Sequence, residues 1–162
     1  MEIESSLKRL RLPERFGAIH VRRGDKVGEN LAWTSETGHH EGLRVEVSEY
    51  LGAVSEKLDL FLLTDDFQTV EEARKILASQ GGHRRLFTLA TGARTGHSTL
   101  ERIAEERFFS EEEVMTLLTE CEVARRAEVF VGTMSSNLSR YVALLRGDLA
   151  SCASLDADWE AV

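Results

Sequence analysis

Cysteine, proline and long apolar runs are all scarce in this sequence of 162 residues. Its two cysteines, Cys121 and Cys152, fit neither a zinc motif nor a disulfide framework, so we expect free thiols. No apolar run approaches the ~20 residues that a membrane-spanning helix needs, and the N-terminus lacks the apolar stretch of a signal peptide. We therefore expect no secretion signal and no transmembrane segment in this chain, whatever a longer parent protein contains.

The two commonest phosphate-binding fingerprints are missing as well. Neither Gly-x-Gly-x-x-Gly nor Gly-x-x-x-x-Gly-Lys-Ser/Thr occurs. The net charge of −8 argues against a general binder of nucleic acid or of anionic membranes. A cluster of cations inside such an acidic chain is informative, because it keeps a local attraction for an anion against the field of the whole protein.

Short apolar runs alternate with amphipathic stretches along the whole chain, as expected for a mostly parallel sheet covered by helices on both faces. The pattern predicts strands at 16–22, 59–63, 85–89 and 128–132, and helices at about 5–11, 45–58, 64–79, 100–107, 111–126 and 137–145. Pro13, the only proline, ends the first helix. We expect one α/β domain of Rossmann-like, doubly wound type over residues 1–162, with its core at about 16–146 and a weakly patterned tail at 147–162.

The first predicted strand ends in a cluster of charged side chains. The cluster consists of His20, Arg22, Arg23, Asp25 and Lys26. A buried strand carries cations only if their charge is compensated, because an unpaired buried cation costs several kcal/mol. The compensating group is either an anionic ligand at the carboxyl end of the sheet or an internal network of ion pairs that includes Asp25. Since arginine grips two phosphate oxygens at once, a phosphate-bearing ligand is the first hypothesis.

Two aspartates follow the second predicted strand. Asp65 and Asp66 could orient an arginine or accept hydrogen bonds from a sugar. Either residue is equally suited to cap the next helix, and Asp65 with Gln68 fits a capping box. Both roles can coexist in the pair.

Residues 132–137, Gly-Thr-Met-Ser-Ser-Asn, join the fourth predicted strand to the last helix. The free amides of a helix N-terminus bind phosphate, and serine hydroxyls add donors. The alternative is that Ser135 or Ser136 caps the helix without any ligand. Three polar clusters at the carboxyl ends of three strands favour a site more strongly than any one of them does.

The three clusters, in this order, resemble the motifs of the α-1,6-fucosyltransferases. Residues 20–28, His-Val-Arg-Arg-Gly-Asp-Lys-Val-Gly, are similar to the family's His-Val-Arg-Arg-Thr-Asp-Lys-Val-Gly. Residues 63–66 resemble its Ala-Thr-Asp-Asp motif, and residues 131–137 with Arg140 resemble its closing Val-Cys-Thr-Phe-Ser-Ser-Gln and downstream arginine. The similarity covers about residues 16–146.

This resemblance implies a GT-B glycosyltransferase that takes fucose from GDP-fucose, inverts the anomeric centre and needs neither metal nor further cofactor. His20 and Glu120 would meet the guanine, Arg22 would hold the β-phosphate with help from Ser136, and Asp65 and Asp66 would support the arginines and the fucose. The implied catalytic residues are Arg22, Lys26 and Glu29, and the implied donor-binding residues are His20, Arg22, Arg23, Asp65, Asp66, Glu120, Ser135 and Ser136. We expect a cleft lined by His20, Arg22, Glu120 and Ser136.

The resemblance also has gaps. Gly24 replaces a threonine, Glu120 replaces an aspartate, and the glutamate of the family's candidate base stands one position early, at Glu29, with Asn30 in its place. The chain resembles only the carboxyl-terminal, donor-binding half of such an enzyme, so an acceptor-binding half would be missing and the isolated chain would be inactive.

The acceptor would be an N-glycan or a chitin-like oligosaccharide. The location would be the Golgi lumen for a membrane-anchored eukaryotic enzyme and the cytoplasm for a bacterial one. The alternatives are a non-catalytic nucleotide-sugar-binding or interaction domain derived from the enzyme, and an unrelated α/β domain with fortuitous ion pairs.

Overall fold

A computed structural model describes residues 3–23, 33–34, 40–41, 45–92, 94 and 109–156. The elements are α1 (Ile3–Leu10), β1 (Phe16–Val21), β2 (Trp33–Thr34), β3 (His40–Glu41), α3 (Val47–Gly52), β4 (Asp59–Thr64), α4 (Phe67–Ser79), β5 (Leu86–Phe87), α6 (Glu111–Arg126), β6 (Val129–Gly132), α7 (Asn137–Arg146), the short 3-10 helix η1 (Leu149–Ser151) and β7 (Cys152–Ser154). The helix expected at about 100–107, together with Lys26 and Glu29, lies outside the described residues.

The main sheet has five strands in the order β5-β4-β1-β6-β7, and every pair of neighbours is parallel. The four strands predicted from the sequence are therefore confirmed. The fifth, β7, lies in the weakly patterned tail, where the sequence predicted no strand. Its Cys-Ala-Ser sequence carries little strand signal of its own, and it forms because its backbone pairs with β6 through Phe130, Val131 and Gly132.

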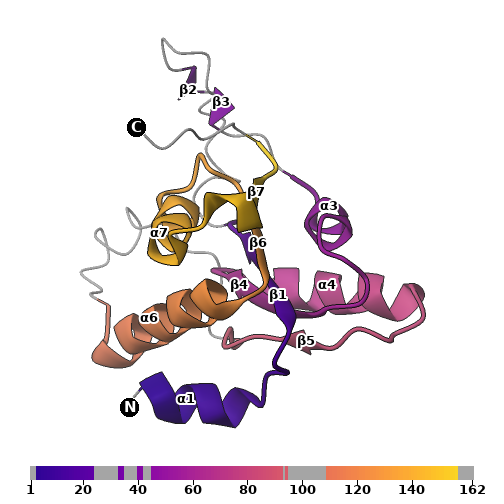
Figure 1. The fold of residues 1–162 in the computed structure, drawn as a ribbon, viewed down its shortest axis with the longest axis horizontal. Helices are drawn as coiled ribbons and strands as arrows, with labels where there is room; N and C mark the ends of the chain where they lie inside the picture. The colour runs from indigo at the N-terminus through magenta and orange to yellow at the C-terminus, as the bar shows by residue number, and fades with distance from the viewer. Residues whose placement is uncertain are drawn as a thin grey trace.

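Helices cover both faces of this sheet, as a doubly wound fold requires (Figure 1). Side chains alternate along β1. Ile19 and Val21 lie in the core shared with α3 and α4, whereas Phe16 and Ala18 lie in the core shared with α6 and α7, with α1 at its margin. The α/β fold class expected from the sequence is confirmed.

The helix expected over 45–58 is much shorter than its apolar spacing indicates. It ends at Gly52, and the chain then turns, with the Leu58 N–H donating to the Ser55 oxygen. Val54 and Leu58 are nevertheless buried. A Cβ atom added at Gly17 would lie only 2.4 Å from the Val54 Cγ1 atom, so the turn packs directly on the glycine of β1. The spacing reflects burial against the sheet, not helical geometry.

Two smaller features complete the fold. Between β1 and α3 in the chain, β2 and β3 form a separate antiparallel pair. The helix α6 begins where expected because Ser110 and Glu113 form a reciprocal capping box. Within the described residues, no helix has both the length and the apolar character needed to cross a membrane.

Candidate functional site

The strand order places a topological switch point between β1 and β6. Chain connections run outward from these two central strands in opposite directions, and ligands of open α/β sheets bind in the crevice at their carboxyl ends. Arg22 and Arg23 follow β1 directly, and Ser135 and Ser136 follow β6. The fold therefore brings the first and third predicted clusters to the same edge of the sheet.

His20 is buried against α7, with only 3% of its surface exposed. Its Nδ1 atom lies 2.7 Å from the Ser139 Oγ atom. Burial, with a smaller contribution from the charge of Arg22, lowers the pKa of His20 to about 4, so the imidazole is neutral at pH 7. In this structure His20 acts as a packed, hydrogen-bonded side chain of the core, and its predicted contact with guanine is untested.

Arg23 is held firmly while one of its donors stays unused. Its backbone N–H donates to the Asp65 Oδ1 atom over 2.9 Å, and its Nη1 atom donates to the Val45 backbone oxygen over 2.9 Å. The Nη2 atom is buried and has no hydrogen-bond partner. A buried guanidinium nitrogen without an acceptor is costly, so an anion placed at this atom would be stabilised.

The two aspartates after β4 have different roles. Asp65 fixes the backbone of Arg23, whereas Asp66 is the N-cap of α4 and accepts a hydrogen bond from the Gln68 N–H over 3.1 Å. The capping box suggested for Asp65 with Gln68 is therefore wrong, because Asp66 takes that place. The second oxygen of Asp66 accepts from the Thr69 hydroxyl over 3.2 Å.

This assignment gives a direct prediction for Asp66. Replacing Asp66 by alanine should lower the free energy of unfolding by about 1 kcal/mol, the usual cost of losing an N-cap. Urea unfolding monitored by circular dichroism measures it. Asp66→Ser should recover most of the loss, because a serine hydroxyl also caps. A loss that serine does not recover would mean that Asp66 has a role other than capping.

The turn after β6 treats its two serines differently. The Ser135 hydroxyl donates to the Asp156 Oδ2 atom in a short hydrogen bond. Ser136 occupies the N-cap position of α7 but makes no side-chain cap, and its Oγ atom is buried without a partner. The alternative in which a serine side chain caps α7 is therefore wrong. An unused buried hydroxyl instead lies at the N-terminus of this helix, directly after β6.

Glu120 is almost fully buried on α6, with 1% of its surface exposed. Its two carboxylate oxygens lie 2.8 and 3.0 Å from the Arg94 Nη1 atom, which also donates to the Thr64 backbone oxygen over 2.7 Å. Burial raises the pKa of Glu120 to about 7, although the charge of Arg94 opposes the shift. Arg94 thus pairs with the carboxylate that, by the family resemblance, would meet a nucleotide base.

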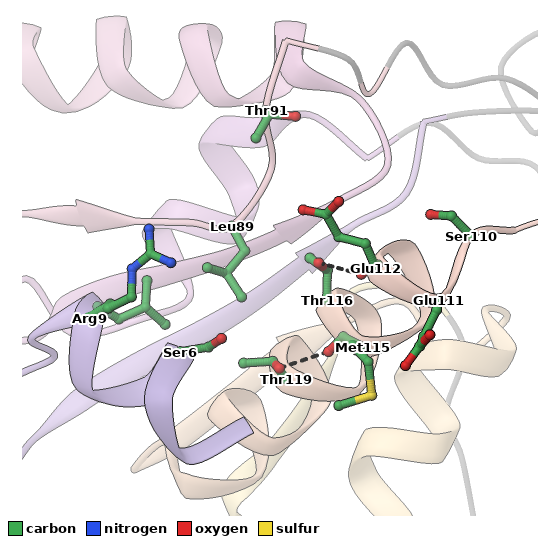
Figure 2. Close-up of a pocket in the computed structure, with 11 residues that line it drawn as sticks. Ser6, Arg9, Leu89, Thr91, Ser110, Glu111, Glu112, Met115, Thr116 and Thr119 are labelled. Carbon is green, nitrogen blue, oxygen red and sulfur yellow. Dashed lines mark hydrogen bonds between the residues drawn. The ribbon is translucent and has the colours of Figure 1, made fainter. Parts of the chain in front are cut away.

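A pocket that the structure shows lies elsewhere. It has a volume of about 900 Å³ and is formed between α1, the segment after β5 and the first half of α6, with Arg9 on one side and Glu111 and Glu112 on the other (Figure 2). None of the predicted site residues lines it. Arg22 does not line this pocket, and the expected cleft around that residue stays a prediction.

Four residues near the predicted site had no signal in the sequence analysis: Tyr50, Arg94, Ser154 and Asp156. The Tyr50 hydroxyl bonds to Thr133 and lies within the fields of Arg23 and Asp156, and burial raises the pKa of this phenol. Each of the four comes from a segment without a recognised motif, and only the fold brings them to the switch point. Among the residues that the structure describes, no three His, Cys, Asp or Glu side chains gather as a metal site.

Comparisons with known proteins give likeness at the level of structure only. No protein-family model matches this sequence, and no curated protein matches it. Two crystal structures of POFUT1, in complex with GDP and with GDP-fucose, align with 96% and 97% of this chain at 16% and 17% identity and TM-scores of 0.55 and 0.54. A third, of the α-1,6-fucosyltransferase NodZ with GDP, aligns with 88% of this chain at 16% identity and a TM-score of 0.48.

The alignments extend over 46% of each POFUT1 chain and 39% of the NodZ chain, so this chain spans less than half the length of these proteins. At such identities the likeness concerns the fold. The chain shares the Rossmann-like α/β fold of a region of POFUT1.

Proposed function

We propose that this chain is the donor-binding portion of a GDP-fucose-dependent fucosyltransferase. The observation that carries the proposal is the pair of buried, unpartnered donors at the switch point, Arg23 Nη2 and Ser136 Oγ. Proteins pair most of their buried polar groups. Two unpaired donors at the place where this kind of sheet binds ligands favour an anionic ligand that would complete them.

The chemistry of the site suits a nucleoside diphosphate. The N-terminus of α7 offers free amides and a favourable dipole to a phosphate. Arg22, half-buried directly after β1, would grip the β-phosphate and stabilise the charge that develops on GDP as the bond to fucose breaks. The fold likeness to POFUT1, a protein crystallised with GDP-fucose, supports the same ligand class.

The base end of the ligand would be recognised by Glu120. A carboxylate matches two adjacent N–H donors, such as guanine offers on one edge. In this structure both Glu120 oxygens accept instead from a single nitrogen, Arg94 Nη1. Arg94 would have to release Glu120 when a base binds. His20, neutral and bonded to Ser139, would support the wall between base and phosphates.

The proposal that the transferred fucose is α-1,6-linked rests on the sequence motifs alone, above all on residues 20–28. Transfer would require an acceptor-binding half that this chain does not resemble, with an N-glycan or chitin-like oligosaccharide as acceptor. A nucleotide-sugar-binding domain without transfer activity is the second candidate. Both candidates predict GDP binding, and only the first predicts transfer once an acceptor-binding half is supplied.

Calorimetric titration with GDP tests the proposal. The unmodified chain should bind GDP weakly, and Arg22→Ala should weaken binding by about 10- to 100-fold, the equivalent of one charge-assisted hydrogen bond. Arg22→Lys should also be impaired, because an ammonium cannot reproduce a two-point grip. Arg85→Ala is the matched control, since Arg85 is exposed and pairs with Asp59 at the opposite end of the strands.

Two outcomes would count against the proposal. If saturating GDP gives no heat of binding and does not change the melting temperature, the proposal is wrong. Equal weakening by Arg22→Ala and Arg85→Ala would show general charge attraction, with no site at the switch point.

A further inference from the structure

We propose that Asp156 is a positioning residue that fixes the Ser135-Ser136 turn so that Ser136 can bind a β-phosphate. The inference rests on the proposed function and adds to it a residue from the tail that carries no motif. Asp156 lies just beyond β7, the strand that the sequence did not reveal. The site residues predicted from the sequence do not explain why the carboxylate of Asp156 lies beside a proposed phosphate site.

The chain after β7 folds back onto the turn through a small network of hydrogen bonds. The two carboxylate oxygens of Asp156 accept from the hydroxyls of Ser135 and Ser154, the second over 3.1 Å. The Ser154 hydroxyl oxygen in turn accepts from the Met134 N–H over 3.2 Å. The Leu155 N–H donates to the Gly132 oxygen over 2.9 Å, which extends the β6–β7 pairing up to the turn. Asp156 therefore holds both a side chain and, through Ser154, the backbone of this turn.

This network separates the roles of the two serines. Ser135 is bound to Asp156, so its hydroxyl proton is already donated. Ser136 is 4% exposed, its backbone N–H donates to the Thr133 oxygen over 3.0 Å, and its hydroxyl has no partner. A turn fixed on one side by Asp156 keeps the hydroxyl of the next residue oriented for a ligand. Ser135 is thus an anchor of the turn, and Ser136 is the donor.

The negative charge of Asp156 is compatible with this role because its oxygens are occupied by hydroxyl donors. Hydrogen bonds to a carboxylate are among the strongest in proteins. These hydrogen bonds hold the turn more firmly than hydrogen bonds between neutral groups would. They also point hydroxyl dipoles at the carboxylate, which reduces its repulsion of a neighbouring phosphate. If Asp156 instead acted as a competing anion, removing its charge would strengthen phosphate binding. The two roles therefore predict effects of opposite sign.

The experiment compares GDP with GMP, which lacks the β-phosphate, by calorimetric titration of the full 162-residue chain. Asp156→Ala and Ser135→Ala should each weaken GDP binding about tenfold, the equivalent of one hydrogen bond to a charged group. Each should leave the affinity for GMP within about twofold of the parent, since in the proposed binding mode only the β-phosphate would contact this serine pair. The variant with both changes should bind GDP about as tightly as the poorer of the two single variants, because both changes break the same hydrogen bond between Ser135 and Asp156.

Asp148→Ala is the matched control. Asp148 carries the same charge in the same segment and caps η1, bonded to the Ala150 N–H, and it has no link to the turn. It should leave the ratio of GDP to GMP affinity unchanged. Melting temperatures check that each variant is folded, and Asp156→Asn, which keeps one acceptor, replaces Asp156→Ala if alanine prevents folding.

Each outcome is decisive. Equal losses for GDP and GMP would indicate a merely structural residue, and a gain in GDP affinity would indicate a competing anion, so both would overturn the inference. GDP binding that no variant alters would overturn it while leaving the proposed function standing. If the unmodified chain binds neither nucleotide, the proposed function fails and the inference fails with it.

Discussion

Replacing Gly132 by valine is expected to lower the free energy of unfolding by about 2–5 kcal/mol, the combined cost of overpacking and of a broken buried hydrogen bond. A Cβ atom at this position would lie 2.6 Å from the Ser139 Oγ atom and 3.1 Å from its Cβ atom. Ser139 is fully buried on α7, so the helix would have to move away from β6. That movement would also separate Ser139 from His20, which it contacts over 2.7 Å.

Urea unfolding of Gly132→Val measures this effect, and Gly52→Val is the control. Gly52 ends α3, and nothing lies within 4 Å of a Cβ atom added there. The control should therefore change the free energy of unfolding by less than about 1 kcal/mol. Because α7 starts at the proposed phosphate site, Gly132→Val should also weaken GDP binding even at temperatures where it is fully folded. An effect no larger than that of the control would mean that the close approach of β6 and α7 carries no strain.

Replacing Arg94 by methionine should destabilise the protein by about 1 kcal/mol more at pH 8 than at pH 5. A Glu120 side chain without its cation can keep its proton, and one pH unit above a pKa of about 7 costs ~1.4 kcal/mol at most. The partial exposure of Arg94 lowers the effect further. Its side chain is 25% exposed and that of Glu120 is 2% exposed. The pKa of Glu120 is about 7 in the folded protein against an ordinary 4.5. At pH 5 the buried group is therefore neutral and needs no cation, whereas at pH 8 it is charged and depends on Arg94.

Whether stability rises or falls with pH depends on which state, folded or unfolded, holds the Glu120 proton more tightly. Below pH 4.5 Glu120 is neutral whether the chain is folded or unfolded, and its charge costs nothing. As the pH rises to about 7, the unfolded chain releases the proton before the folded one does, so stability falls, by ~3 kcal/mol in the parent protein. Without Arg94 the pKa of Glu120 would rise further and the fall would be larger.

Unfolding curves of Arg94→Met and the parent at pH 5 and pH 8 test this expectation. His20 titrates in the opposite direction, since its lowered pKa of about 4 costs stability as the pH falls from 6.5. Its contribution is common to both proteins and cancels in the difference. In proteins that also carry Glu120→Gln, the loss of stability caused by Arg94→Met should be the same at pH 5 and at pH 8, because the amide does not titrate. The same loss at both pH values would mean that Arg94 stabilises the fold by packing or neutral hydrogen bonds alone.

Some features of the site were predictable because they are local. A buried strand ending in cations, 16–23, and a glycine-serine turn into a helix, 132–137, each fix their own conformation. The capping role of Asp66 was one of two predicted alternatives, and it follows from the helix that starts beside it. In each case the residues that determine the structure are neighbours in the chain.

Other features could not be predicted because their partners are distant in sequence. Arg94 and Glu120 are 26 positions apart, and Ser135 and Asp156 are 21 apart. Neither Arg94 nor Asp156 belongs to a pattern, so nothing marks them until the strands are ordered. The pocket beside α6 likewise depends on how α1 and the segment after β5 pack together.

The sequence by itself determined the alternation of strands and helices, and with it a doubly wound sheet with polar clusters at its carboxyl edge. The periodicity of apolar residues is a property of short segments, so the sequence encodes it directly. Only the tertiary structure decided the fifth strand and the burial of Glu120 against Arg94. It also decided that Ser135 bonds to Asp156 whereas the Ser136 hydroxyl has no partner. These depend on which strands become neighbours, because desolvation and hydrogen bonding between distant residues exist only after the chain has packed.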